Sequence, residues 1–225
     1  MNTFMFEGRR QLPALCRRQL LSRLFCGVAL PSLSVALGGC LATVPQQKEG
    51  RPFNTLRDYS REGHKVRIVN RNRFDAAFSP VVVTSPYDEP AGTVIINTKK
   101  RQLFLIEKGG KARRYGIAVG RAGYAWSGRA IIGRKKRWPA WHPTNEMRKS
   151  APHIPRRIAP GEENPLGARA LYLFKGGKDT LYRIHGTSEP WTIGTRASSG
   201  CIRMFNEDVI DLFDRVRLRA KVRVI

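Results

Sequence analysis

The sequence predicts a mostly β domain with one minor helix, arranged as a sandwich or barrel-like sheet. Three observations lead to this fold class. Short runs rich in β-branched residues recur from residue 81 onward, paired glycines stand between several of them, and a single stretch repeats apolar residues at helical spacing. With 225 residues, of which 41% are hydrophobic, the chain is long and apolar enough to form one such core.

The expected strands share β-branched or aromatic residues at most positions, and they lie at residues 81–84, 93–97, 102–106, 114–119, 130–132, 170–174, 181–185 and 221–225. Gly109-Gly110 separates the third and fourth of these runs, and Gly176-Gly177 separates the sixth and seventh. Because paired glycines favour tight reversals of the chain, we expect a β-hairpin at each of these places.

The expected helix begins at Asn206, whose side chain is suited to capping a helix N-terminus. Glu207 and Asp208 follow in the first turn, where the helix dipole favours acidic side chains. Apolar residues then repeat at helical spacing, at Val209, Leu212, Phe213 and Val216.

Residues 134–169 break the strand pattern with six prolines and with Trp138 and Trp141. A long irregular stretch in a compact domain is usually functional or disordered, and the tryptophans argue against disorder. We expect this segment to form a lid or wall over the functional site.

The N-terminal 40 residues have the layout of a secretory signal peptide. Five arginines precede an apolar stretch at 24–37, and small residues then lead to Cys40. Residues 36–40 resemble a bacterial lipobox, in which the cysteine is acylated. We therefore expect a signal peptide at 1–40 with lipidation at Cys40, a linker or loosely packed extension at 41–80, and a folded domain at 81–225.

The net charge of +24 favours acidic partners. Nucleic acid, anionic lipid and a wall polymer rich in carboxylates remain open on charge alone. The basic run 133–138 ends in a tryptophan, as a single-strand binder would need, although a solvated loop is the simpler interpretation. The sequence has no metal-ligand cluster and no phosphate-binding loop, so no metal and no cofactor are expected.

The four cysteines are unevenly distributed. Cys16, Cys26 and Cys40 lie in the predicted export segment, and only Cys201 lies in the predicted folded domain. Once the first 40 residues are removed or Cys40 is acylated, no disulfide framework is possible. A lone thiol in an oxidising compartment is either a small buried hydrophobe or a functional group.

Two segments of the chain contain this cysteine and a candidate histidine. They are Ile184-His185-Gly186-Thr187 and Ser198-Ser199-Gly200-Cys201-Ile202-Arg203-Met204. A histidine can take the proton of a thiol and later return it to a leaving amine. Ser199 and Gly200 let the backbone approach a substrate and direct N–H groups at a developing oxyanion. Cys201 lies shortly before a helix start, which favours thiolate, and Arg203 can pair with a substrate carboxylate.

These segments resemble the catalytic domain of L,D-transpeptidases of the YkuD/ErfK type, over roughly residues 90–225. The family motif is a His-Gly strand end followed by Ser-x-Gly-Cys-x-Arg, and Asn164-Pro165-Leu166-Gly167 also resembles the stretch before the catalytic strands. The resemblance implies that the domain at 81–225 is catalytic. Many members carry a second histidine directly before the Gly-Cys pair, whereas this chain has Ser199.

The resemblance also implies a role for each matching residue. Cys201 is the expected nucleophile and His185 the expected base, oriented by the backbone carbonyl of Gly186. The expected oxyanion and substrate pocket is formed by Ser198, Ser199, Gly200 and Arg203. Thr187 and Trp191 lie between His185 and Cys201 in the chain and complete the expected substrate-binding residues.

The implied reaction joins peptidoglycan stem peptides in the periplasm or cell envelope. A tetrapeptide stem acylates the cysteine and releases D-alanine, and an amine of a neighbouring stem or of an envelope protein attacks the thioester. Two alternatives remain open, an L,D-carboxypeptidase with water as the acceptor and a catalytically idle wall-binding scaffold. Export argues against nucleic acid as a partner, and contact with the membrane is expected only through a lipid anchor.

Overall fold

The computed structural model describes residues 50–120, 126–196 and 201–225. The predicted signal peptide, with Cys40, lies outside the described residues, and so does the segment Ser198–Gly200 of the predicted site. The mostly β fold class with a minor helix is confirmed.

The described chain forms one sheet of eleven strands in the order β1-β2-β5-β4-β3-β11-β7-β8-β9-β10-β6. The strands are β1 (Arg51–Pro52), β2 (Val81–Thr84), β3 (Val94–Asn97), β4 (Gln102–Glu107), β5 (Lys111–Gly116), β6 (Ala118–Val119), β7 (Gly128–Arg137), β8 (Arg169–Lys175), β9 (Lys178–His185), β10 (Ile202–Arg203) and β11 (Lys221–Val224). The described helices are α2 (Asn145–Ser150) and α3 (Asn206–Arg215), with short 3₁₀ turns η1 (Ser60–Glu62), η2 (Arg71–Arg73), η3 (Ala76–Phe78) and η4 (Pro190–Thr192).

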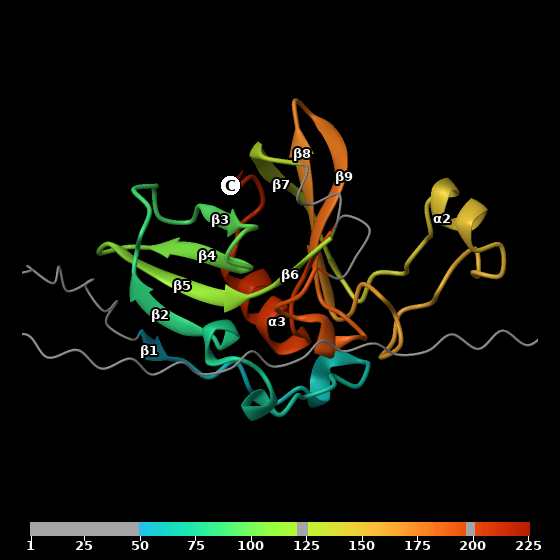
Figure 1. Ribbon diagram of the computed structural model, residues 1–225, viewed down its shortest axis with the longest axis horizontal. Helices are drawn as coiled ribbons and strands as arrows, with labels where there is room; N and C mark the ends of the chain where they lie inside the picture. The colour runs from blue at the N-terminus through green and yellow to red at the C-terminus, as the bar shows by residue number, and fades with distance from the viewer. Residues whose placement is uncertain (1–49, 121–125, 197–200) are drawn as a thin grey trace, which may run out of the picture. The chain divides into compact units, whose positions relative to one another are not determined.

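The sheet bends round α3, which lies between its two halves (Figure 1). The single strand predicted at 114–119 is in fact two strands separated by Ile117. β5 pairs within the first half of the sheet, whereas β6 pairs with β10 at its far end. The chain therefore crosses from the first half of the sheet to its far end at Ile117.

Both predicted hairpins are confirmed. β4 pairs antiparallel with β5, and β8 pairs antiparallel with β9. The turn between β4 and β5 requires glycine, because Gly109 and Gly110 have φ angles of 70° and 67° in the left-handed region.

β7 is longer than the predicted strand at 130–132. It extends to Arg137 and pairs with β8 from Ile131 to Arg137, so residues 134–137 are strand and not loop. Lys135 Nζ donates to the carbonyl oxygens of Phe213 and Val216 at 2.5 and 2.6 Å, at the C-terminal end of α3. Trp138 is buried. Part of the basic run considered for nucleic acid is therefore engaged inside the protein.

Helix α3 supplies the apolar centre of the fold. Val209, Leu212 and Val216 pack into the main core with residues from both halves of the sheet, as their spacing predicts. The predicted cap is wrong, because Phe205 occupies the N-cap position without a side-chain hydrogen bond. Asn206 is already helical, and its side chain turns toward the loops beside β9.

The linker predicted at 41–80 is packed against the domain over its described part. The Thr55 hydroxyl is buried and donates to Asp208 at 3.0 Å, and Arg71 donates to the Asp208 carboxylate at 2.7 and 3.0 Å. Arg71 also lies 3.4 Å from Glu207 and 3.8 Å from the centre of the Phe205 ring. Glu207 and Asp208 are buried, and burial raises the pKa of both carboxyls, so the Arg71 charge offsets part of a large desolvation cost.

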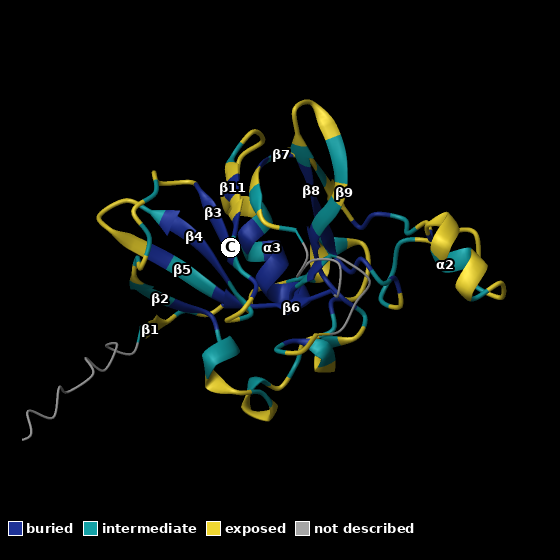
Figure 2. Cartoon of the chain, turned by 45° about the horizontal axis from the view of Figure 1, so that its top comes forward, coloured by how far each residue is buried: buried dark blue, intermediate teal, exposed yellow. Residues whose placement is uncertain are grey.

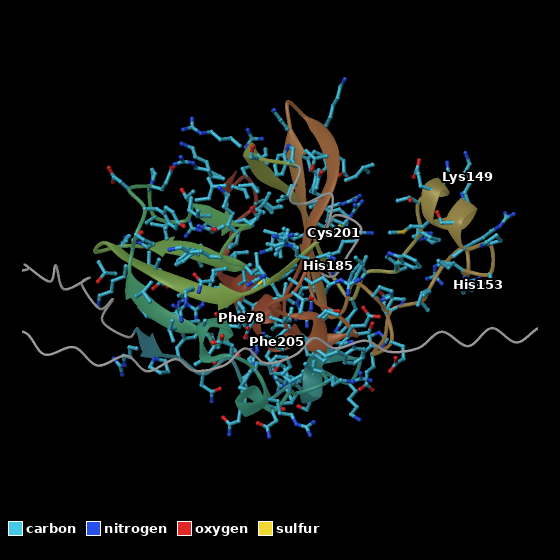
Figure 3. The ribbon with its side chains drawn as sticks, viewed as in Figure 1. Phe78, Lys149, His153, His185, Cys201 and Phe205 are labelled. Atoms are coloured by element: carbon cyan, nitrogen blue, oxygen red, sulfur yellow. The ribbon has the colours of Figure 1, made fainter. Side chains whose placement is uncertain are left out.

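The middle of the segment after β7 forms an arm that lies away from Cys201 and His185. It carries α2 at its tip, and a bridge between Trp141 and Ile158 closes its base. Figure 2 shows α2 largely exposed, away from the buried strands. In Figure 3, Lys149 and His153 lie on this arm, well apart from Cys201 and His185, so the arm is not the predicted lid, whereas the end of the segment, at Gly167 and Ala168, lies against Gly186 in the turn after His185.

Candidate active site

His185 ends strand β9, and Cys201 directly precedes the neighbouring strand β10. β10 runs parallel to β9, with Ile202 beside Ile184 and Arg203 beside His185. The two isoleucines point into the core, where each is nearly fully buried. Because strand side chains alternate, the residues flanking them, including Cys201, Arg183 and His185, share the opposite face. Figure 3 shows Cys201 and His185 close together at the end of β9.

His185 is held in one tautomer. It is 4% exposed, and its Nδ1 lies 2.5 Å from the carbonyl oxygen of Gly186, the contact expected from the sequence. A carbonyl can only accept a hydrogen bond, so Nδ1 carries the proton and Nε2 carries the lone pair. Burial, helped by the charges of Arg203 and Arg183, lowers the pKa of His185 to about 3 against the opposing effect of the Gly186 contact. The imidazole is therefore neutral at physiological pH.

The thiol of Cys201 is half-buried, and its Sγ lies 3.9 Å from the carbonyl oxygen of Leu181. Burial raises the pKa of the Cys201 thiol, while Arg183 and Arg203 act to lower it. The sequence-based expectation of a thiolate favoured by the helix start is therefore wrong, because desolvation outweighs the charges nearby. At rest the site holds a neutral thiol and a neutral imidazole.

The side chain of Asn206 holds the turn that follows His185 through hydrogen bonds. Its Oδ1 accepts hydrogen bonds from the backbone N–H groups of Ala168 and Thr187 at 3.0 and 3.3 Å, and its Nδ2 donates to the Thr187 carbonyl at 2.9 Å. A Cβ at Gly186 would lie 2.1 Å from this Oδ1, so the position requires glycine. Thr187, predicted to bind substrate, is buried and takes part in this turn.

We expect Asn206→Ala to lower both stability and turnover. The change leaves two buried N–H groups and one carbonyl without their partner, which costs about 2–4 kcal/mol. It also releases the turn whose Gly186 carbonyl orients His185, so we expect kcat to fall by about tenfold. Thermal unfolding and steady-state turnover measure the two effects.

Asn164→Ala is the matched control for this prediction. Asn164 is equally buried and bonds loop backbone at Ile158, Ala159 and Leu166. Its loss should reduce stability by a similar amount and change kcat far less. Equal losses of kcat in the two variants would show that Asn206 has no particular connection to His185.

Arg203 is already paired within the protein. Its Nη1 donates to Glu189 Oε2 at 2.6 Å and lies 3.5 Å from Thr192 Oγ1. A substrate carboxylate would have to share or displace Glu189, which the sequence analysis did not foresee.

Trp191 stands on η4 and is 64% exposed. It borders a groove of about 680 Å³ whose other wall comes from residues 67–78. The predicted linker therefore contributes to a surface near the loop between His185 and Cys201.

Three residues beside the site were not predicted from the sequence, namely Arg183, Glu189 and Asn206. Arg183 lies two positions before His185 on the same strand, so the alternation of strand side chains could have identified it. Nothing in the local pattern identifies Glu189, and Asn206 has the features of an ordinary helix cap. No group of three or more potential metal ligands occurs among the described residues. Within the same residues, no helix is long and apolar enough to span a bilayer.

A thiol and a neutral imidazole on one face of adjacent strands have the features of a cysteine-dependent acyl-transfer site. The sequence model of the YkuD family, described as the L,D-transpeptidase catalytic domain, matches residues 91–224. The chain belongs to this family.

Relatives agree with this assignment. The chain is 33% identical over 141 residues to the probable L,D-transpeptidase YbiS of Escherichia coli, covering 59% of this chain and 44% of that protein. It is 30% identical over 194 residues to a putative L,D-transpeptidase from the ATP synthase subunits region of Fuscovulum blasticum, covering 86% of this chain and 93% of that one. The chain thus spans less than half the length of some of the curated relatives it matches.

Among solved structures, a protein of Brucella melitensis described as a probable carnitine operon oxidoreductase is 51% identical to this chain. The match covers 69% of this chain and 99% of that one, with a TM-score of 0.48.

Proposed function

We propose that the protein is an L,D-transpeptidase that acts on the tetrapeptide stems of peptidoglycan, with Cys201 as the nucleophile and His185 as the general base. The observation that carries the proposal is the contact between His185 Nδ1 and the Gly186 carbonyl. It leaves Nε2 unprotonated on the strand face that the thiol shares.

The proposed acylation step starts from neutral groups. The thiol proton passes to His185 Nε2 as Sγ bonds to the carbonyl carbon of the stem, and the π electrons of that carbonyl move to its oxygen. Collapse of this intermediate breaks the C–N bond to the terminal D-alanine. The departing amine takes the proton from His185, which leaves a thioester on Cys201 and a neutral imidazole.

The acceptor decides the product. An amine of a neighbouring stem gives a 3→3 cross-link, an amine of an envelope protein gives a wall-anchored protein, and water gives an L,D-carboxypeptidase. The net charge of +24 supports attraction to carboxylate-rich stems. Location in the cell envelope, with acylation at Cys40, belongs to the same proposal and rests on the residue pattern at 1–40.

The test is mass spectrometry of the protein and of its products after incubation with purified tetrapeptide muropeptides. We expect a thioester adduct on the peptide containing Cys201, release of D-alanine, and dimeric products. Release of D-alanine without dimers would favour the carboxypeptidase or a protein acceptor. Absence of both adduct and release would favour the idle wall-binding scaffold.

A further inference from the structure

The carbonyl oxygen of Leu181 joins the thiol to an arginine that the motif does not include. Arg183 Nη1 donates to this oxygen at 2.6 Å, and Cys201 Sγ lies 3.9 Å from it. Leu181 has a φ angle of 62°, in the left-handed region that is unfavourable for leucine, and its side chain is 64% exposed. This conformation falls where the register between β8 and β9 shifts, and the Leu181 N–H donates to Asp179 Oδ1 at 2.8 Å, so a local bulge in β9 turns the Leu181 carbonyl toward both groups.

Two neighbours hold the Arg183 guanidinium without neutralising it. The guanidinium lies 4.9 Å from the centre of the Tyr172 ring, and its Nη2 is 3.8 Å from Asp179 Oδ2. The second contact is an ion pair without a hydrogen bond, so Asp179 offsets the Arg183 charge less than a hydrogen-bonded carboxylate would. Arg203, by contrast, is bonded to Glu189 at 2.6 Å, which offsets part of its field at the thiol.

We infer that Arg183 is a catalytic residue whose guanidinium stabilises the negative charge that develops on Cys201 Sγ. This inference rests on the proposed function. As the thiol proton moves to His185 Nε2, sulfur gains negative charge before its bond to the substrate carbonyl is complete. A fixed cation beside the sulfur lowers the energy of the transition state in which this charge develops. The effect is strongest where water is excluded.

The groups that face the thiol support this assignment. On β9 these are Arg183, His185 and, farther off, Asp179. On β10 the facing charge is Arg203, paired with Glu189. Burial raises the pKa of Cys201, and the charge and hydrogen bonds of Arg183 oppose this rise more than Arg203 does. A neutral His185 cannot supply the missing positive charge at rest.

The chain offers a matched control in Arg134. Its guanidinium lies 4.0 Å from the centre of the same Tyr172 ring, and its Nη2 is 3.7 Å from the same Asp179 oxygen. The contact that distinguishes Arg183 is the one with the Leu181 carbonyl beside the thiol. Arg134→Gln therefore removes a similar charge from the same surroundings without touching the reacting atom.

The experiment measures the rate at which iodoacetamide alkylates Cys201 as a function of pH, read from the peptide that contains Cys201. In Arg183→Gln we expect the midpoint of the alkylation profile to rise by about one pH unit, with about a tenfold slower reaction at pH 7. Arg183→Lys should recover part of the shift, and Arg134→Gln should leave the profile unchanged. With muropeptide substrate, we expect Arg183→Gln to lower kcat by about tenfold with little change in KM.

An unchanged alkylation profile in both Arg183 variants would overturn the inference. So would equal shifts in Arg183→Gln and Arg134→Gln, because a diffuse field would then explain both. A rise in KM alone would show that Arg183 binds substrate instead. Alkylation needs no peptidoglycan, so its result holds even if the protein shows no transpeptidation. If Arg183→Gln does not fold, Arg183→Lys still tests the inference.

Discussion

Replacing Cys201 with serine is expected to lower kcat/KM for D-alanine release by about 10⁴-fold or more. Serine keeps the size of the side chain, so the fold should be unaffected. Its hydroxyl is far less acidic than a thiol, so His185 removes its proton far less readily, and the alkoxide is formed at a much higher energy than the thiolate. The measurement is steady-state release of D-alanine, together with the mass of the protein after incubation with substrate.

The matched control for this prediction replaces Cys16, Cys26 and Cys40 together with serine. If Cys201 is the nucleophile, this variant should retain the turnover of the unmodified protein in a purified assay. Turnover that survives in Cys201→Ser and disappears in the triple variant would place the nucleophile elsewhere in the chain.

Replacing His185 with asparagine is expected to lower kcat by about 10²- to 10⁴-fold. The amide nitrogen of asparagine can occupy the place of Nδ1 and donate to the Gly186 carbonyl, so the turn can remain intact. The variant lacks a counterpart of Nε2 and therefore cannot accept the thiol proton. Single-turnover acylation of Cys201 measures the effect, and a variant that acylates at the normal rate would exclude His185 as the base.

The same variant tests the ionisation state of His185 through stability. The folded pKa of about 3 lies below the ordinary value of 6.5, so between these two pH values the unfolded chain takes up a proton that the folded chain does not. The folded state thus loses stability as the pH falls through this window, on the order of 3 kcal/mol by pH 4.5.

His185→Asn lacks this ionisation and should lose less stability on acidification than the unmodified protein. Glu207 and Asp208 titrate in both proteins, so their contribution cancels in the comparison. Urea unfolding at pH 7 and pH 4.5 measures the difference. Parallel losses in the two proteins would mean that the imidazole is already exposed to protonation in the folded state.

Much of the fold follows from local pattern. The two hairpins form where paired glycines separate β-branched runs, because those turns need the left-handed conformations that glycine adopts freely. Helix α3 forms where apolar residues recur at helical spacing, and Val209, Leu212 and Val216 reach the core as that spacing predicts. Each of these outcomes depends on residues near one another in the chain.

Local pattern failed where the stabilising contacts are polar and come from distant residues. The segment before β2 has little apolar periodicity, yet Thr55 and Arg71 hold it to Asp208 across more than 130 residues of chain. Trp138 and Lys135 belong to a basic run that suggests a loop, and their partners lie on η1 and at the end of α3. Such pairings leave no periodic signal in either segment.

The sequence by itself determined that the chain is mostly β and that Cys201, His185 and Gly186 belong to one motif. The tertiary structure decided how those groups ionise, because burial and charges from other strands set a pKa, and neither is written in the motif. It also decided which arginine faces the thiol. The register between β9 and β10 places Arg183 near Cys201. Glu189, from the loop after β9, pairs with Arg203.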